Sequence, residues 1–185
     1  MVAQAKSGTG KTAIFSIAVL QPITTSDPHC QTLVLALTRE LAKQIQTVAM
    51  ALSDYTDITC HACIGGVQIS ADIEKLESGQ QIVVGTPGRM LDLINYGYLR
   101  TEAIQIFVLE KADKMLSLGL KNQIKEIFRC LTYDVKVILL SAIILDEVLG
   151  VTKHFMDNSA GILIKQEGLT LEGIRQFCVN VEQEV

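Results

Sequence analysis

Strand-like and helix-like segments alternate along this 185-residue chain, and this alternation limits the fold more than any other feature. Short, continuous apolar runs are typical of strands that are buried on both faces of a parallel sheet. Between these runs lie longer segments with apolar residues at helical spacing, which is the arrangement that produces βαβ units. The sequence therefore predicts an α/β fold in three layers, with a mostly parallel sheet between helices.

Hydrophobic spacing and turn residues assign the individual elements. The predicted strands are Thr32–Leu37, Ile58–Ile64, Gln81–Gly85, Ile104–Leu109, Val135–Leu140 and, at the end, Arg175–Val181. The predicted helices are Ala13–Leu20, Thr38–Ser53, Val67–Leu76, one that begins at Pro87, Leu120–Leu131 and Leu145–Met156. A polar stretch with two Glu-Gly pairs, residues 166–173, is predicted to be a linker.

The composition limits the classes of function. Apolar residues make up 49% of the chain and charged residues 19%, which is typical of a globular domain and not of a disordered one. A net charge of −4 argues against a surface coated with charge for nucleic acid, but it leaves a local basic groove open. Five irregularly spaced cysteines suit reduced thiols. Cys60 and Cys63 form a CxxC without a second pair, so we interpret them as buried strand residues rather than metal ligands.

A glycine-rich loop stands immediately before the first predicted helix and fits the P-loop pattern, with alanine in place of its first glycine. It comprises Ala5, Lys6, Ser7, Gly8, Thr9, Gly10, Lys11 and Thr12. Gly8 and Gly10 let the backbone curl, so that successive N–H groups point at phosphate oxygens near the helix N-terminus. Lys11 is placed to reach the β- and γ-phosphates, and the Thr12 hydroxyl to bind Mg²⁺. The motif predicts a nucleotide site.

Few residues precede this loop. A P-loop normally follows a buried strand, whereas only Met1–Gln4 stand before Ala5. We therefore expect the N-terminal strand of the sheet to be missing, either because the chain is truncated or because the loop is poorly anchored.

Further short segments follow the loop in a fixed order. They are Thr38-Arg39-Glu40-Leu41-Ala42, Gly65-Gly66, Thr86-Pro87-Gly88-Arg89, Glu110-Lys111-Ala112-Asp113 and Ser141-Ala142-Ile143. Taken singly, each is more often an ordinary helix start or turn, whereas their joint order is specific. Together with the phosphate loop they closely resemble the DEAD-box ATP-dependent RNA helicases, in particular those of translation initiation. The resemblance runs from Ala3 to Glu184.

The resemblance implies the first of two RecA-like P-loop NTPase domains. Residues 1–165 would form this ATP-binding domain, and residues 166–185 the linker and first strand of an otherwise absent second domain. ATP and Mg²⁺ are the implied cofactors, and single-stranded RNA, held by its backbone, is the implied partner. Glycine turns, helix starts and a few arginines can hold phosphates in this way without reading bases. The implied RNA contacts are Thr38, Arg39, Gly65, Gly66, Thr86, Gly88 and Arg89.

The acidic motif departs from the family pattern Asp-Glu-Ala-Asp. In the family, the first Asp helps to hold Mg²⁺ and the Glu activates the attacking water. Glu110 takes the metal position, together with Thr12, with a carboxylate one methylene further out, a tolerable change for an ion that prefers octahedral geometry. Lys111 takes the position of the catalytic base. A protonated lysine cannot accept a proton, and loss of a general base typically costs about 10²–10⁴ in rate.

Two more departures concern catalysis. Ile143 replaces a threonine whose hydroxyl, in the family, couples the nucleotide site to RNA. The absent second domain would supply arginine fingers, which are worth about 10³–10⁵ in phosphoryl transfer. The catalytic positions that the resemblance implies are Lys11, Glu110, Lys111, Asp113 and Ser141.

We predict an RNA helicase-like domain that binds ATP, Mg²⁺ and RNA and hydrolyses ATP poorly or not at all. One alternative is a catalytically dead pseudoenzyme that holds nucleotide, RNA or a helicase partner. Another is a truncated copy without a stable function, whereas a P-loop kinase would leave the RNA segments unexplained. We expect a monomer without a membrane segment, located in the cytoplasm or alternatively in the nucleus, with scaffold proteins of translation initiation as candidate partners.

Overall fold

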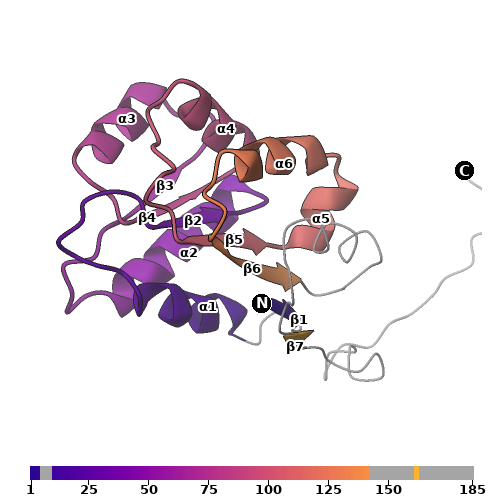
Figure 1. Cartoon of the computed structure of the whole chain (residues 1–185), viewed down its shortest axis with the longest axis horizontal. Coiled ribbons are helices and arrows are strands. Elements are labelled where there is room, and N and C mark those ends of the chain that lie inside the picture. Colours follow the sequence, from indigo (N-terminus) through magenta and orange to yellow (C-terminus); the bar gives the residue numbers. More distant parts are fainter. Residues whose placement is uncertain (5–9, 142–160, 163–185) are drawn as a thin grey trace, which may run out of the picture.

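The structure is a computed structural model that describes residues 1–4, 10–141 and 161–162 (Figure 1). Its strands are β1 (Val2–Gln4), β2 (Thr32–Leu35), β3 (Cys60–Cys63), β4 (Ile82–Gly85), β5 (Ile106–Glu110), β6 (Lys136–Ser141) and β7 (Gly161–Ile162). Its helices are α1 (Lys11–Leu20), α2 (Arg39–Leu52), α3 (Ile69–Glu77), α4 (Pro87–Asn95), α5 (Ala112–Ser117) and α6 (Lys121–Arg129).

The strands form a single sheet in the order β3-β4-β2-β5-β6-β1-β7, and every neighbouring pair is parallel. Helices α1 and α2 cover one face, and α3 to α6 cover the other (Figure 1). This is the predicted three-layer α/β architecture. Because the carboxyl ends of parallel strands all lie on the same side of a sheet, the described loops that follow β2, β3, β4 and β5 begin on that side.

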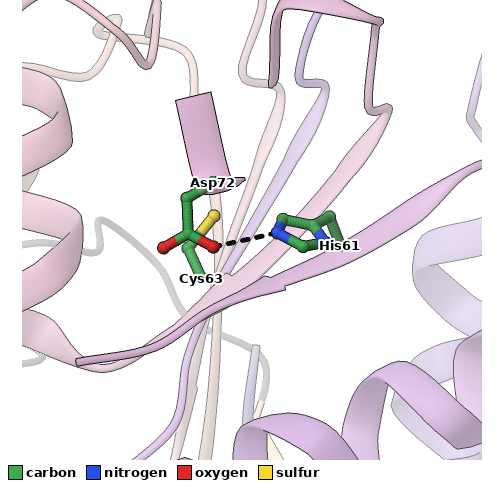
Figure 2. A group of neighbouring side chains, drawn as sticks. All are labelled: His61, Cys63 and Asp72. Atoms are coloured by element: carbon green, nitrogen blue, oxygen red, sulfur yellow. Dashed lines mark hydrogen bonds and ion pairs between the residues drawn. The ribbon is translucent and has the colours of Figure 1, made fainter. Parts of the chain in front are cut away.

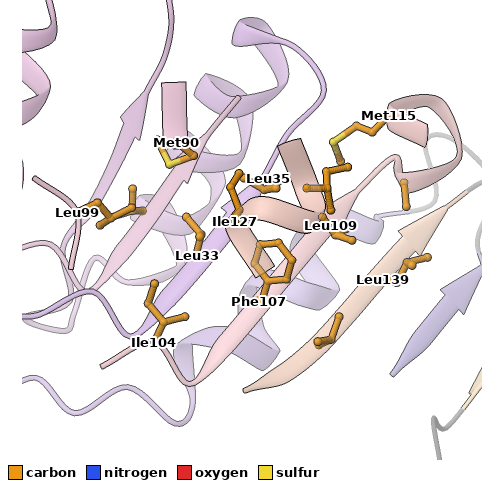
Figure 3. Close-up of a cluster of buried hydrophobic side chains, with 14 of the residues drawn as sticks. Leu33, Leu35, Met90, Leu99, Ile104, Phe107, Leu109, Met115, Ile127 and Leu139 are labelled. Carbon is orange, nitrogen blue, oxygen red and sulfur yellow. The ribbon is translucent and has the colours of Figure 1, made fainter. Parts of the chain in front are cut away.

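Burial on both faces explains why the strand sequences are continuously apolar. Leu33 and Phe107 point into the core under α4 and α6, where Figure 3 shows them beside Ile127. Val34 and Val108, one position further along the same strands, point into the opposite core under α1 and α2. Side chains alternate between the two faces with a period of two, so both sets must be apolar.

The N-terminal strand is present, so the expectation that it is missing is wrong. Val2 to Gln4 pair with Leu139 to Ser141 of β6 on one side, and Val2 and Ala3 pair with β7 on the other. The Met1 ammonium also donates to the Val137 carbonyl oxygen at 2.7 Å. Three residues form a strand here because β6 and β7 offer backbone hydrogen-bonding partners on both sides. The short sequence of Val2–Gln4 does not indicate this pairing.

The other predicted strands of the described region form with their ends shifted by a few residues, and so do the predicted helices. Helix α5 was not predicted, because its six residues are too short to show helical spacing. The predicted helix Leu145–Met156, the linker and the strand Arg175–Val181 lie outside the described residues. Within the described ranges, no helix has the length and apolar character needed to cross a membrane.

Candidate nucleotide and RNA site

The first turn of α1 carries the end of the phosphate loop. Gly10 caps this helix with φ +85°, a left-handed backbone conformation that glycine adopts without a steric cost. Lys11 and Thr12 follow directly in the first turn, and the N-terminus of a helix attracts anions through its partial positive charge. The remaining loop residues, Ala5 to Thr9, lie outside the described residues, so their phosphate contacts stay a prediction.

Glu110 ends β5 and is only 3% exposed. Its Oε2 atom is buried and has no hydrogen-bond partner among the described residues. Burial raises the pKa of Glu110 from its ordinary 4.5 to about 7, although the positive charges of Lys11 and Lys111 act to lower it. The acid from β5 and the loop lysine from α1 therefore lie within electrostatic reach of each other. A buried carboxylate oxygen without a donor fits the oxygen ligand that Mg²⁺ prefers.

Lys111 makes the turn between β5 and α5. Its φ of 58° and ψ of 48° make it the one non-glycine residue with positive φ in the described ranges. Such a backbone costs about 1–2 kcal/mol for a residue with a side chain, and strain of this kind concentrates at functional sites. Its side chain is exposed and ends in an ammonium group, which donates hydrogen bonds but cannot accept a proton when charged.

A buried hydrogen bond joins the acidic segment to the end of β6. The Ser141 hydroxyl donates to Asp113 Oδ1 at 2.7 Å, and both residues are buried. Two segments that were grouped only by resemblance are therefore in direct contact. Ile143, the departure expected to uncouple nucleotide from RNA, lies outside the described residues.

The predicted RNA contacts after β2 and β3 lie next to each other. The Thr38 hydroxyl caps α2 by accepting from the Leu41 backbone N–H at 3.2 Å. The neighbouring Arg39 guanidinium lies against the turn of Gly65 and Gly66, since a Cβ added at Gly66 would stand 2.8 Å from Arg39 Cζ. Gly66 also has φ +85°, a backbone conformation that favours glycine there, whereas the exposed Arg39 side chain is free to move away from an added Cβ.

Helix α4 presents a second free N-terminus after β4. Thr86 makes no side-chain capping bond, and Pro87 occupies the first turn. A Cβ added at Gly88 would meet only Gln123 Oε1, at 3.9 Å, so packing alone does not require glycine there. The helix start is therefore accessible to a phosphate oxygen. The Arg89 guanidinium is bonded within the protein, to Asp72 and to the Val67 carbonyl oxygen, and its expected RNA contact stays a prediction.

The CxxC in β3 does not form a metal pair. Cys60 and Cys63 are three positions apart on a strand and lie in opposite cores, as we interpreted from the sequence. Burial raises the pKa of the Cys60 thiol to about 12. His61 and Cys63 instead share a face with Asp72 of α3, and their ligand atoms lie within 4.8 Å of one another (Figure 2).

Both oxygens of Asp72 are already engaged in this group. His61 Nε2 lies 3.0 Å from Oδ1, and Arg89 bonds to Oδ2. The carboxylate is therefore satisfied by protein donors, and we interpret the group as an ion-pair network. Asp72 was not among the residues predicted from the sequence. The one available signal was an acidic residue in the first turn of a helix whose partly buried residues are apolar.

Comparison with known proteins agrees with this geometry. The DEAD/DEAH box helicase family matches residues 1–149. Eukaryotic initiation factor 4A of Drosophila melanogaster is 58% identical over 184 residues, which are 100% of this chain and 46% of that protein. The Caenorhabditis elegans factor of the same name is 54% identical, with the same coverage. The chain thus spans about half the length of the curated relatives it matches.

Solved structures show the same fold. A DEAD box protein from the hyperthermophile Methanococcus jannaschii matches with a TM-score of 0.83 and 34% identity, covering 87% of this chain and 44% of that one. Dbp5 of S. cerevisiae, bound to RNA and ADP BeF3, matches with a TM-score of 0.83 and 34% identity, over 95% of this chain and 44% of that one. The chain therefore belongs to the DEAD/DEAH box helicase family.

Proposed function

We propose that this chain is an RNA helicase domain that binds ATP with Mg²⁺, holds single-stranded RNA by its backbone, and hydrolyses ATP poorly or not at all. The observation that carries the proposal is the edge of the sheet where Lys11, Glu110 and the Asp113–Ser141 bond come together. Ligands of parallel α/β domains bind at this edge. A relative from Mycosarcoma maydis, 54% identical, has the name ATP-dependent RNA helicase eIF4A.

For the nucleotide, the N-terminus of α1 would hold the phosphates, with Lys11 as their counter-charge. Thr12 and Glu110 would provide oxygen ligands for Mg²⁺, and the bound ion would supply positive charge to the phosphates. The residues of the loop from Ala5 to Thr9 would add backbone N–H groups. The orphaned Oε2 of Glu110 supports this assignment, because metal binding would give that buried oxygen a partner.

Hydrolysis needs a group that orients and deprotonates water, and Lys111 supplies none. Asp113 does not replace that function, because its carboxylate already accepts a bond from Ser141 in a buried position. A lost general base costs about 10²–10⁴ in rate. We therefore infer a chain that retains the means to bind ATP and lacks the means to cleave it at the rates of its relatives.

RNA would lie along the same edge of the sheet, across the loops after β2, β3 and β4. Arg39 is exposed beside the Gly65–Gly66 turn, and the start of α4 at Thr86 and Gly88 is uncapped. Successive backbone N–H groups with one arginine suit a sugar-phosphate backbone, without contacts that read bases. The structure of yeast Dbp5, which was solved with RNA bound, supports this choice of ligand.

A pseudoenzyme that binds nucleotide, RNA or a helicase partner is the second candidate, and the replacement at Lys111 favours it. It differs from the first only in whether any turnover remains.

We also propose a monomer in the cytoplasm, with a nuclear location open, that retains contacts with scaffold proteins of translation initiation. Light scattering of the purified chain tests whether it is a monomer.

Nucleotide binding is tested by thermal unfolding with and without ATP and Mg²⁺. We expect ATP with Mg²⁺ to raise the melting temperature, because a ligand that binds only the folded state stabilises it. The Lys11→Ala variant should lose most of this rise, since it removes the counter-charge for the phosphates. An equal rise in the parent and in Lys11→Ala, or none in the parent, would contradict the proposed site.

A further inference from the structure

Asp72 joins three segments that surround the predicted RNA track. Its side chain is 3% exposed and lies in the first turn of α3. His61 of β3 donates from Nε2 to Oδ1 at 3.0 Å, and Arg89 of α4 donates to Oδ2 (Figure 2 shows the His61 contact). The second arm of Arg89 donates to the Val67 carbonyl oxygen at 2.8 Å. We refer to His61, Val67, Asp72 and Arg89 as the Asp72 clasp.

The clasp adjoins both segments where phosphates are proposed to bind. Val67 follows Gly66, whose backbone forms the glycine turn after β3. Arg89 follows Gly88, at the uncapped start of α4 after β4. Arg89 therefore ties the glycine turn to the helix start by a single planar group. Charged hydrogen bonds from a guanidinium fix orientation more strictly than neutral ones do.

We propose that Asp72 is a positioning residue for the RNA backbone, which sets the spacing between the Gly65–Gly66 turn and the start of α4 through Arg89. This inference rests on the proposed RNA function of those two segments. In this arrangement Arg89 acts through the protein and does not bind a phosphate itself. Its side chain is only 10% exposed, and one N–H group on each terminal nitrogen already donates within the protein, so the guanidinium offers little surface to a phosphate.

His61 supports the carboxylate from the other side. A carboxylate only accepts hydrogen bonds, so Nε2 of His61 carries the proton in this contact. The hydrogen bond from His61 to Oδ1 links Asp72 to β3, so the carboxylate is held between the sheet and α4. The sheet therefore serves as the rigid base from which the clasp orients two loops.

The test is RNA binding by the 185-residue chain, with a fluorescein-labelled single-stranded oligouridine and fluorescence anisotropy at several salt concentrations. Three variants form a cycle: Asp72→Asn, Arg89→Gln and the double variant. Gln31→Leu is the matched control. It removes another buried hydrogen-bonding side chain, which lies at the amino-terminal ends of the strands, away from the proposed RNA track. Circular dichroism checks the fold, and His61→Gln provides a milder variant if Asp72→Asn does not fold.

We expect each single variant to weaken RNA binding about tenfold, and the double variant no further, because both remove the same link. The affinity for ATP and the salt slope should remain those of the parent, and Gln31→Leu should bind RNA normally. The inference is overturned if Asp72→Asn binds RNA as the parent does. It is also overturned if Arg89→Gln alone weakens binding and lowers the salt slope by about 0.7, the mark of one lost phosphate contact. A parent that binds no RNA would overturn the proposed function as well, which distinguishes the two failures.

Discussion

Replacing Glu110 by glutamine should flatten the dependence of the chain's stability on pH. Burial raises the pKa of Glu110 to about 7, against an ordinary 4.5, so the folded state binds a proton that the unfolded state releases between these values. The free energy of unfolding therefore falls as the pH rises through this range, and this loss is complete just above the folded pKa. Glutamine does not titrate, so the variant should lack this part of the pH dependence.

The size of the effect follows from the pKa difference. A rise from 4.5 to about 7 corresponds to about 3 kcal/mol of lost stability once Glu110 is fully ionised, at 1.36 kcal/mol per pKa unit. Roughly 2 to 3 kcal/mol of that loss falls between about pH 5 and pH 8. Any fixed packing cost of the glutamine amide is the same at both pH values. It therefore cancels when the difference between variant and parent is compared.

Urea unfolding, followed by circular dichroism in the absence of nucleotide and metal, measures this difference. Glu102→Gln is the matched control, because Glu102 is an exposed glutamate in the same half of the chain. We expect the stability of Glu110→Gln relative to the parent to rise by roughly 2 to 3 kcal/mol from about pH 5 to pH 8. A change no larger than that of Glu102→Gln would refute the account of a buried, destabilised acid at the end of β5.

Three further substitutions test individual contacts by urea unfolding and RNA anisotropy. Ser141→Ala removes the donor to buried Asp113 and should cost about 1–3 kcal/mol, whereas an unchanged midpoint would contradict that bond. Thr38→Ala removes the cap of α2 and should cost about 1 kcal/mol, with Thr38→Ser close to the parent. Gly66→Ala should cost about 1–3 kcal/mol because of the positive φ, and should weaken RNA binding because Arg39 must move away from the new methyl group; an unchanged stability would contradict the strained backbone.

The parallel sheet was predictable because its signal is local. Runs such as those around Val34 and Phe107 are apolar at every position, and burial on both faces is the arrangement that requires this. The strand at Val2–Gln4 was missed for the opposite reason. Three residues carry almost no pattern, and the strand exists because β6 and β7 lie beside it. Such pairing is a property of the tertiary structure.

The candidate site also has parts that could be predicted from the sequence and parts that could not. The resemblance grouped Ser141 and Asp113 in one site, and their direct hydrogen bond follows from the pairing of β5 with β6, which the structure shows and the sequence did not predict. The Asp72 clasp could not be predicted, because its bonds join residues from different elements that have no fixed spacing in the chain. Arg89 shows the limit of transfer by resemblance: the motif implies an RNA contact, which stays a prediction, but it does not indicate the hydrogen bonds to Asp72 and Val67 that the structure contains.

The most direct test of the central claim is phosphate release from ATP in the presence of saturating RNA. The chain spans about half of its curated relatives, so it should be joined to the second domain of an initiation factor 4A relative. Three proteins are compared: the parent, Lys11→Ala and the double variant with Glu110→Asp and Lys111→Glu. We predict no release above Lys11→Ala for the parent and clear RNA-stimulated release for the double variant. Equal, RNA-stimulated release by the parent and the double variant would contradict the claim that Lys111 has ended catalysis.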